Sequence, residues 1–524
     1  MLRKRPRILL TAVIVATAVS VALAGCTAAS GPGSTASAAP KPTSGGSIAI
    51  GGLATSALDP GQLGYSTQSQ AYTDQIFGSL FLPPLKTGDK VRPGVATGYK
   101  YNSDNTQLTL TLRSGAKYQD GTPVDADSVV WNLKRWGAPG MTSAQYFTEV
   151  SSIVADGTDK VVISFDKPFT LLIDAFAYTP AGYLGSETAF NKLGADGFNT
   201  APVGAGPFKV DTVQPGQELD LVKADTYWDA KHVYLAKVSW INSGNDPQSS
   251  LVKLQSGAIQ SVTFATTNTS PEVLKQGEQD PSLTELRTAS TGYAILPVNT
   301  FAAPFNDLKA RQAISYCMDR ESIAKNAMQG YATPSYVISG DSDYLTKWQD
   351  GKGLNPYQFS VSKGKKLVTE LGGLSFDIVT NADSPILDAL QQQWSTCGIT
   401  AKIDIRSDYL NQVQAGTYQM SFTVASQRTY NPAMTTAYQD PTTANDKFGF
   451  NDSQVTSGIN EAKGLVEGAQ AKALWVKVWK RVAELAVSIP VVASPRFVFS
   501  TKCLQGVDTA GNSAGGYVNA YLTC

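Results

Sequence analysis

Hydrophobic and polar residues follow two different periods along this chain. Residues 47–53 (SIAIGGL) and 107–115 (QLTLTLRSG) alternate apolar with small or polar residues and end at glycines, which predicts short β-strands followed by loops. Residues 124–136 and 308–328 place hydrophobic residues three or four positions apart, which predicts helices with one buried face. Because such strands and helices interleave along the chain, the pattern predicts α/β lobes without a long disordered linker between them.

The same criteria locate the neighbouring elements. Residues 117–122 (KYQDGT) contain Asp120-Gly121, a strong turn signal, and Asp125 or Asp127 can cap the helix that follows. Further strands are expected at 160–165, 203–210, 293–299, 378–380, 401–405, 420–424 and 495–500, and further helical segments at 251–259, 367–371, 386–396 and 474–487.

Length and composition then restrict the class of protein. A chain of 524 residues exceeds what one hydrophobic core usually organises, so two or three packed units are expected. The 43 basic residues balance the 43 acidic ones, which gives no positive surplus for binding nucleic acid. His232 is the single histidine of the sequence, which argues against catalytic triads and metal sites built on histidine.

The first 25 residues have the pattern of an export signal. Four basic residues precede a hydrophobic run at 8–23, which is shorter than the roughly 20 residues that a membrane-spanning helix needs. The run ends in LAGC at 23–26, which resembles the lipobox of bacterial lipoproteins. We therefore expect a lipoprotein signal peptide at 1–25 and a lipid on Cys26, which would hold an exported protein at the outer face of the cytoplasmic membrane. An uncleaved anchor helix is the alternative.

Residues 26–46 follow as a flexible tether, because they consist mainly of Ala, Gly, Ser, Thr and Pro with one charged residue. Without the leader, 39 basic and 43 acidic residues remain, so the exported body is mildly acidic.

Four further cysteines permit disulfides in an exported protein, and they allow three pairings. We favour a bond between Cys503 and Cys524, which would close a terminal segment rich in Gly and Asn. Cys317 lies in an apolar helical stretch, where a buried free thiol is an equal alternative to a disulfide. Cys397 is the fourth cysteine of the body.

Several phrases of the body occur together in one known family. They are LDP at 58–60, RPGVA at 92–96, the segment 108–135, PVGAGPFKV at 202–210 and PFNDLKARQAISYCMDRESIA at 304–324. In this order they resemble extracytoplasmic solute-binding protein family 5, the substrate-binding lipoproteins of peptide and nickel ABC importers.

The resemblance implies a bilobal, periplasmic-binding-protein-like α/β fold (type II, cluster C) with an extra small lobe inserted in lobe one. Carried over by phrase position, lobe one comprises 47–80, 200–290 and 488–524, the inserted lobe 81–199, and lobe two 291–487.

The resemblance also implies a ligand between the lobes. Candidate ligand-binding residues are Thr55, Ser56 and Leu58 from lobe one, and Gln427, Arg428, Tyr430 and Asn431 from lobe two. Trp394 is a weaker candidate, because packing in a helix core is the favoured explanation for it.

Two positions depart from the family pattern. Arg428 stands where peptide binders carry an Asp that pairs with the ammonium group of the ligand. A guanidinium suits a carboxylate, phosphate or sulfonate instead, or it pairs with a carboxylate of the protein. Gln260 replaces an Asp of the family, and we expect this difference to concern folding.

Other chemistry finds little support. Residues 511–515 match G-x-S-x-G, but a hydrolase would need an acid and a histidine after the serine. Nickel prefers nitrogen and sulfur ligands, which one histidine supplies poorly, and the sequence has no ATP-binding P-loop.

We therefore predict a monomeric binding protein, without catalytic residues or cofactor, that delivers a peptide-like or anionic organic solute to an ABC permease and its ATPase subunits. A glycosidase-like exported hydrolase with paired carboxylates and a nickel-chelate binder are the alternatives.

Overall fold

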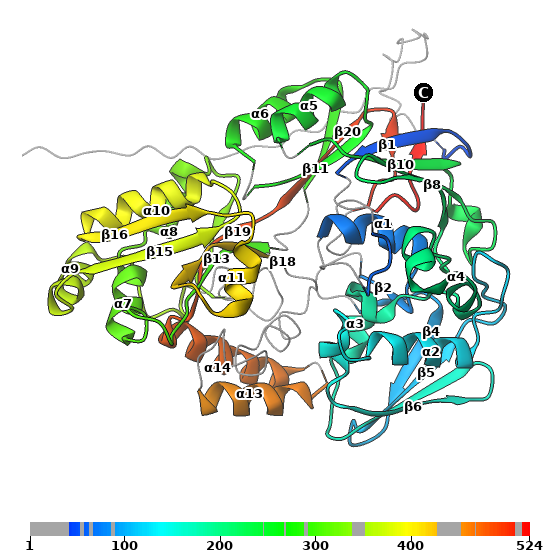
Figure 1. Cartoon of the computed structure of the whole chain (residues 1–524), viewed down its shortest axis with the longest axis horizontal. Coiled ribbons are helices and arrows are strands. Elements are labelled where there is room, and N and C mark those ends of the chain that lie inside the picture. The colour runs from blue at the N-terminus through cyan, green and yellow to red at the C-terminus, as the bar shows by residue number, and fades with distance from the viewer. Residues whose placement is uncertain are drawn as a thin grey trace, which may run out of the picture. The chain divides into compact units, whose positions relative to one another are not determined.

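Figure 1 shows a computed structural model of the chain. The structure describes residues 41–52, 57–61, 67–84, 90–244, 246–266, 269–287, 292–337, 352–426, 452–466, 468–508 and 516–524. Cys26, the predicted signal peptide and most of the predicted tether lie outside these residues.

The largest sheet has seven strands in the order β12-β20-β11-β1-β10-β9-β8. Its strands are β1 (Ser47–Gly51), β8 (Phe208–Gln214), β9 (Glu218–Lys223), β10 (Lys237–Ile241), β11 (Ser261–Ala265), β12 (Leu283–Arg287) and β20 (Arg496–Thr501). Strand β1 runs parallel to β10 and β11, and the other neighbours are antiparallel. Because β20 lies between β11 and β12, a C-terminal strand completes a sheet that contains the first strand of the body.

Gln260 forms hydrogen bonds to β1 at the centre of this sheet. Its Oε1 accepts a hydrogen bond from the backbone N–H of Ala49 at 2.7 Å, and its own N–H donates to the Ala49 carbonyl at 2.7 Å. Its Nε2 donates to the Gly257 carbonyl at 2.9 Å, next to the turn where Gly257 has φ +75°. The residue that departs from the family pattern therefore serves the fold, as expected.

A second sheet is antiparallel and has the order β4-β5-β7-β6. It contains β4 (Ala96–Tyr101), β5 (Gln107–Leu112), β6 (Val150–Asp156) and β7 (Lys160–Phe165). Helix α2 (Ala126–Trp136) begins after Asp125, whose carboxylate accepts from the Ser128 N–H, and it buries Val129, Leu133 and Trp136 as predicted. The limits of an inserted lobe at 81–199 stay a prediction.

Residues 292–426, together with β19, build two further sheets. One has the order β14-β19-β13-β18, with β13 (Gly292–Pro297), β14 (Thr333–Pro334), β18 (Thr423–Ser426) and β19 (Ser488–Ser494). The other is parallel and has the order β16-β15-β17, with β15 (Leu374–Thr380), β16 (Ile399–Ile405) and β17 (Met420–Ser421). Two short pairs join β2 (Phe81–Leu82) to β3 (Arg92–Pro93) and β21 (Leu504–Gln505) to β22 (Tyr521–Leu522).

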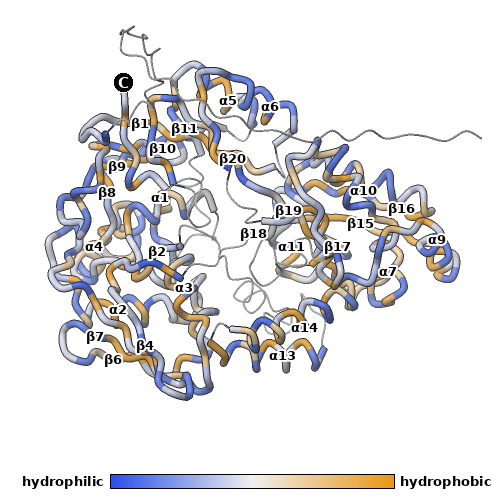
Figure 2. The backbone as a smooth tube through the Cα atoms, turned by 180° about the vertical axis from the view of Figure 1, so that it is seen from behind, coloured by the Kyte–Doolittle hydropathy of each residue, from blue (hydrophilic) through white to orange (hydrophobic). Residues whose placement is uncertain are grey.

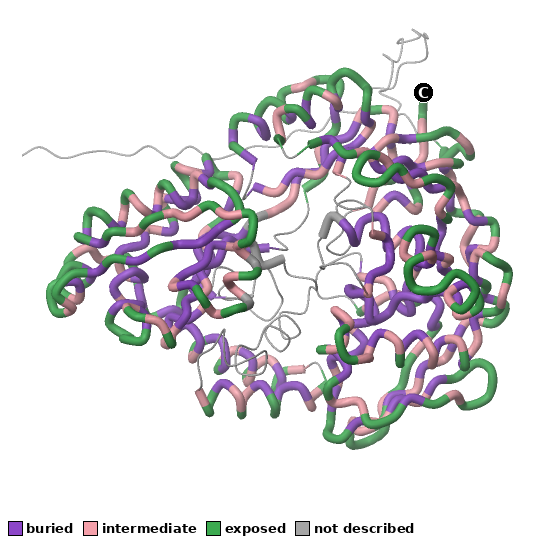
Figure 3. The backbone as a smooth tube through the Cα atoms, in the orientation of Figure 1, coloured by how far each residue is buried: buried purple, intermediate pink, exposed green. Residues whose placement is uncertain are grey.

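Helices surround these sheets (Figure 1). Besides α2 they are α1 (Thr67–Phe77), α3 (Leu172–Tyr178), α4 (Glu187–Thr200), α5 (Pro247–Gln255), α6 (Pro271–Gln279), α7 (Leu308–Tyr316), α8 (Arg320–Ser322), α9 (Val361–Glu370), α10 (Pro385–Thr396), α11 (Tyr409–Ala415), α13 (Ser453–Lys463) and α14 (Ala469–Leu485). In Figure 3 exposed residues gather on the outer turns of α5 and α6, whereas β13 and β20 consist mainly of buried residues.

Buried apolar side chains form separate cores. The first core joins the four-stranded antiparallel sheet, α1, α2 and one part of the seven-stranded sheet, and it continues into α13 and α14. The second core lies among the sheets of residues 292–426, with α7 and α10. A third core packs α5 and α6 against β11 and β20. Figure 2 shows hydrophobic and hydrophilic residues mixed along α13 and α14, as expected of helices with one buried face.

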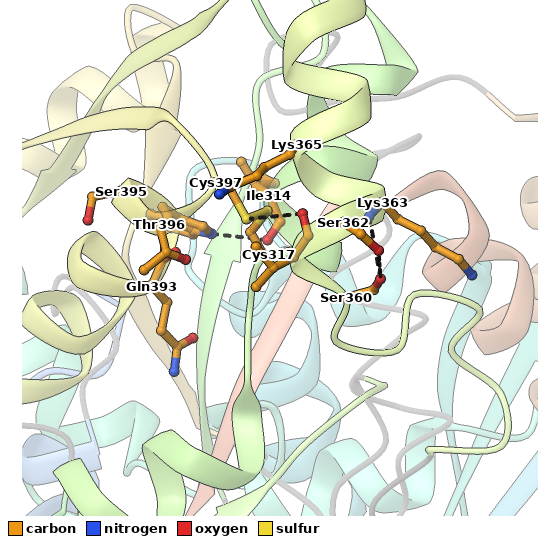
Figure 4. The surroundings of a disulfide bond; sticks show 12 residues. Ile314, Cys317, Ser360, Ser362, Lys363, Lys365, Gln393, Ser395, Thr396 and Cys397 are labelled. Atoms are coloured by element: carbon orange, nitrogen blue, oxygen red, sulfur yellow. Dashed lines mark hydrogen bonds between the residues drawn. A yellow bond between two sulfur atoms is a disulfide. The ribbon is translucent and has the colours of Figure 1, made fainter.

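Two disulfides connect the four cysteines of the body. Cys503 is bonded to Cys524, which is the pair that the sequence favours. Cys317 is bonded to Cys397, so the free-thiol alternative for Cys317 is wrong. Figure 4 shows this second bridge beside Ile314 and Thr396. A side chain at Gly364 of α9 would lie 2.0 Å from the Cys317 sulfur, so the bridge requires a glycine there.

Two sequence predictions need correction, and the predicted lobe boundary at 488 stays a prediction. The helix expected at 308–328 ends at Tyr316, because Asp319 caps a new short helix by accepting from the Ser322 N–H at 2.9 Å. The strand expected at 420–424 is divided between β17 and β18, which pair with different sheets. The predicted lobe boundary at 488 falls at the start of β19, which pairs with β13 and β14; the chain enters the seven-stranded sheet only at β20.

Within the described part of the chain, no helix has both the length and the apolar character needed to cross a membrane.

Candidate functional site

The predicted lobe-one contacts lie on the loop that follows β1. This loop begins at Gly52, which has φ +123° and donates its N–H to the Ile241 carbonyl at 2.9 Å. A side chain on Gly51 would lie 2.8 Å from Ile259 Cδ1, so only a glycine fits at the end of the strand. The chain thus leaves the sheet at a fixed point, at the carboxyl end of a central strand.

The returning end of the loop is held by Asn199, at the end of α4. The backbone N–H groups of Leu58 and Asp59 both donate to Asn199 Oδ1, at 3.1 and 2.9 Å. Asp59 is buried, accepts from the Gly61 N–H at 3.1 Å and forms an ion pair with Arg135 of α2. Both flanks of the loop that carries Thr55 and Ser56 are therefore tied to rigid elements.

Arg135 is enclosed by aromatic rings. Its guanidinium carbon lies 4.4 Å from the ring centroid of Trp136, 4.6 Å from Phe190 and 5.8 Å from Trp131. Cation–π contacts of this kind favour a charged group in a partly desolvated place. The ion pair between Asp59 and Arg135 therefore joins two of the phrases that carry the family resemblance, and neither residue was assigned this role from the sequence.

The glycine-rich segment at 202–210 packs closely against Gln119 and the end of α1. Gln119 Nε2 donates to the carbonyls of Ile76 and Phe208, at 2.8 and 2.7 Å, and Gln119 Oε1 accepts from the Gly204 N–H at 2.9 Å. Side chains on Gly204 or Gly206 would approach backbone oxygens of α1 to 2.2 and 2.3 Å. These glycines permit close packing of backbone on backbone.

Asp74 on α1 is the titratable group of this region with the largest departure from ordinary behaviour. Burial raises the pKa of its carboxyl from 3.8 to about 7, although a hydrogen bond from the Tyr183 hydroxyl opposes that shift. The sequence offers no signal for this residue, since a lone Asp in a polar helical segment is ordinarily a solvated one.

The predicted lobe-two contacts follow β18. This strand pairs antiparallel with β13, from Gly292 opposite Ser426 to Ile295 opposite Thr423. Gln427, Arg428, Tyr430 and Asn431 lie outside the described residues, as do Thr55 and Ser56, so their contact with a ligand stays a prediction.

Two candidate residues lie in the hydrophobic cores. Leu58 is completely buried in the first core, so its side chain supports the loop from inside. Trp394 is completely buried in the second core, packs edge-on against Phe376 at 5.5 Å and donates its indole N–H to the Ile314 carbonyl at 3.0 Å. These contacts favour the alternative of helix-core packing for Trp394, and contact of either residue with a ligand stays a prediction.

The described residues include His232, the single histidine, but no cluster of side chains suited to a metal ion. His232 is about half exposed, and its Nδ1 lies 2.8 Å from Asp229 Oδ1, the geometry of a surface pair. No group of three or more His, Cys, Asp or Glu residues suited to a metal ion occurs among the described residues. The G-x-S-x-G match at 511–515 lies outside them.

Two cavities lie away from the loops discussed above. One of about 510 Å³ is lined by residues of the loops next to the four-stranded antiparallel sheet, such as Asn105 and Glu149, and by residues of α13, such as Glu461. The other, of about 350 Å³, lies between α6 and residues 329–331. Leu58 and Trp394, the two predicted ligand-binding residues among those that the structure describes, line neither cavity.

Solved structures place the fold among the type II periplasmic binding proteins. The periplasmic binding protein DppA from Helicobacter pylori, in complex with the peptide STSA, superimposes with a TM-score of 0.79 at 21% identity, over 92% of this chain and 98% of that one. AgaA of A. tumefacien R10, in complex with agropinic acid, gives a TM-score of 0.78 at 21% identity, over 91% and 99%.

The particular family follows from the sequence. Residues 90–447 match the model of the bacterial extracellular solute-binding proteins, family 5 (middle region), so the chain belongs to this family. The glutathione-binding protein GsiB of Salmonella paratyphi A is 29% identical over 367 residues, which are 68% of each chain. The resemblance seen in the sequence phrases is thereby confirmed.

Proposed function

We propose that this protein captures a peptide-like, anionic organic solute outside the cytoplasm and delivers it to an ABC permease and its ATPase subunits. The family match over residues 90–447 is the observation that carries the proposal. The relative GsiB is named for binding glutathione, a short peptide-like molecule that carries two carboxylates. Arg428 supports the anionic character of the solute, since a guanidinium binds a carboxylate with two parallel hydrogen bonds.

Capture works by binding alone. We infer that Thr55 and Ser56, which precede the fixed residue Asp59, contact the solute from lobe one, and that Arg428, which follows β18, contacts it from lobe two. A solute that contacts both segments favours the arrangement in which they face each other, and the importer recognises that arrangement. No covalent step is required, and the protein acts as a monomer without a cofactor.

The test is a titration of the purified protein with reduced glutathione by isothermal calorimetry. Dipeptides, opines, phosphonates and a nickel–histidine complex serve as further probes. We expect stoichiometric binding of an anionic, peptide-like probe that is recovered unchanged. Turnover of a probe would favour the hydrolase alternative, and binding of the nickel complex alone would favour the chelate alternative; either result contradicts the proposal.

Arg428 is tested with a matched variant. We expect R428A to weaken binding of the anionic probe at least tenfold, because removal of a charge-assisted bidentate contact costs about 1.5–3 kcal/mol. Arg406 is a suitable control, since it is exposed and paired with Asp408 at 2.8 Å on the surface. Equal affinities of R428A and R406A would show that Arg428 does not bind the solute.

We further propose that a lipid on Cys26 holds the protein at the outer face of the membrane. The sequence LAGC at 23–26 and the low-complexity stretch after it support this proposal. In a cell fractionation, C26A should move from the membrane to the soluble extracellular fraction. A C26A protein that stays wholly with the membrane after cleavage of the leader would contradict lipid anchoring.

A further inference from the structure

Helices α13 and α14 form a helical hairpin (residues 453–485) whose two ends are fixed to different parts of the molecule. A helix ends with backbone carbonyls that lack partners within the helix, and these must be satisfied by other donors. In this hairpin the donors for the end of α13 come from segments next to the four-stranded antiparallel sheet. The donors for the end of α14 come from residues of the second core.

The first junction joins the turn after α13 to Thr170 and Asn105. The Thr170 hydroxyl donates to the carbonyls of Lys463 and Leu465, at 3.1 and 2.8 Å, and its backbone N–H donates to Lys463 at 2.9 Å. Asn105 Nδ2 donates to the Gly464 carbonyl at 3.1 Å. All three successive carbonyls of the turn are thus held by residues more than 290 positions away in sequence.

The second junction fixes the end of α14. Arg311 Nε donates to the Leu485 carbonyl at 2.9 Å, and the Tyr357 hydroxyl donates to the Glu484 carbonyl. The N–H of Val298, directly after β13, donates to the Val487 carbonyl at 3.0 Å. From this point the chain continues into β19, a strand of the sheet that contains β13.

The two junctions differ in strength. The second combines a buried arginine with a continuous β-sheet. In the first, the polar contacts come from two residues, Thr170 and Asn105, beside a cavity of about 510 Å³ that Asn105 and Gly464 both line, although the hairpin also shares apolar packing with the first core. In Figures 1 and 2 the hairpin crosses at the bottom of the body, whereas β20, which carries the chain between the sheets, lies near the top. A rotation about β20, where the chain passes between the sheets, would therefore separate the first junction before the second.

We infer that the first junction is a latch that forms and breaks as the two cores move relative to each other, with Thr170 and Asn105 as its positioning residues. The latch lies outside the loops that are proposed to touch the solute, so it sets the arrangement of the cores before any solute binds. This inference rests on the proposed capture mechanism, but it can be tested in the protein without ligand.

The test is a distance measurement between two spin labels in the ligand-free protein. Keto amino acids at the exposed positions Asp159 and Thr400 carry the labels and leave the native cysteines untouched. The double variant T170V/N105G removes the three side-chain hydrogen bonds of the latch, and glycine retains the φ of +57° found at Asn105. We expect its distance distribution to shift toward longer distances by several ångströms.

The control is T97V, which removes a threonine hydroxyl that donates to the Thr111 carbonyl at 3.2 Å inside the four-stranded antiparallel sheet. T97V should keep the wild-type distribution. If T170V/N105G also kept that distribution, Thr170 and Asn105 would not hold the cores, and the inference would be wrong.

A crosslinked variant covers the case in which T170V/N105G does not fold. A Cβ atom at Gly464 would lie 3.0 Å from Pro168 Cβ, so P168C/G464C can form a disulfide after a small shift. We expect the crosslinked protein to show a narrower distribution than the wild type, limited to the shorter distances. An unchanged distribution would mean that this junction never opens, which overturns the inference whatever solute the protein binds.

Discussion

The first and second cores bring distant segments together by different means. In the first core, buried polar side chains bind backbone groups and each other: Asp59 pairs with Arg135, and Asn132 both donates to and accepts from Gly185. In the second core, the disulfide between Cys317 and Cys397 joins α7 to the end of α10. The comparison teaches that the first core depends on a buried ion pair and on pH, whereas the second core adds a disulfide to its buried hydrogen bonds and so depends on oxidation.

Removal of the buried disulfide should have the largest effect. By the chain-entropy model, a crosslink that spans 80 residues contributes about 4.5 kcal/mol, whereas the terminal bridge from Cys503 to Cys524, which spans 21, contributes about 3 kcal/mol. We expect C317A/C397A to lose more free energy of unfolding than C503A/C524A in denaturant titrations. A greater loss of unfolding free energy in C503A/C524A would contradict the comparison, because the more stabilising crosslink would then lie outside the second core.

The buried ion pair of the first core comes next. D59A leaves the Arg135 guanidinium buried without its carboxylate partner, so we expect a loss of about 3 kcal/mol in the free energy of unfolding. The exposed pair between Lys309 and Glu370 provides the control, and E370A should cost less than about 1 kcal/mol. A similar small loss in both variants would show that polar partners do not hold the first core.

The smallest expected effect concerns Asp74 and pH. Its pKa of about 7 in the folded protein lies above the ordinary 3.8, so between about pH 4 and pH 7 the folded protein keeps a proton that the unfolded chain releases. The stability from this site is therefore complete below pH 4 and falls as the pH rises to about 7. D74N, which cannot ionise, should become more stable relative to the wild type as the pH rises from 4 to 8, and denaturant titrations at each pH measure the difference.

The control for Asp74 is D156N, which changes an exposed carboxylate on β6. Its difference from the wild type should stay nearly constant in the same unfolding experiments. If D74N behaved in the same way as D156N, the first core would not have the pH dependence that distinguishes it from the second.

Much of the fold could be predicted because local patterns determined it. The alternation at β1 and β5, the cap at Asp125 and the turn at Gly121 depend on neighbouring residues, and each occurs where the sequence indicates. The break after Tyr316 could not be predicted in this way, since the apolar spacing continues across it and only the cap at Asp319 separates the helices.

The site was predictable only in part. Family phrases located the loop after β1, but the role of Leu58 depends on packing against segments far away in sequence, as does the bond from Trp394 to Ile314. Asp74 was missed for the same reason, because its pKa depends on burial that no local pattern shows. The contacts of Arg428 with a solute remain a prediction.

The close approach of Gly364 to the Cys317 sulfur has a consequence for grafting. An engineer who moved the Cys317–Cys397 bridge into a relative would have to bring a glycine to the facing turn of the neighbouring helix as well. With alanine there, the new methyl group would occupy the space of the sulfur, and the two cysteines would be kept apart. The bridge is therefore a module of three residues, and an exchange of the cysteines alone would transfer the thiols without the crosslink.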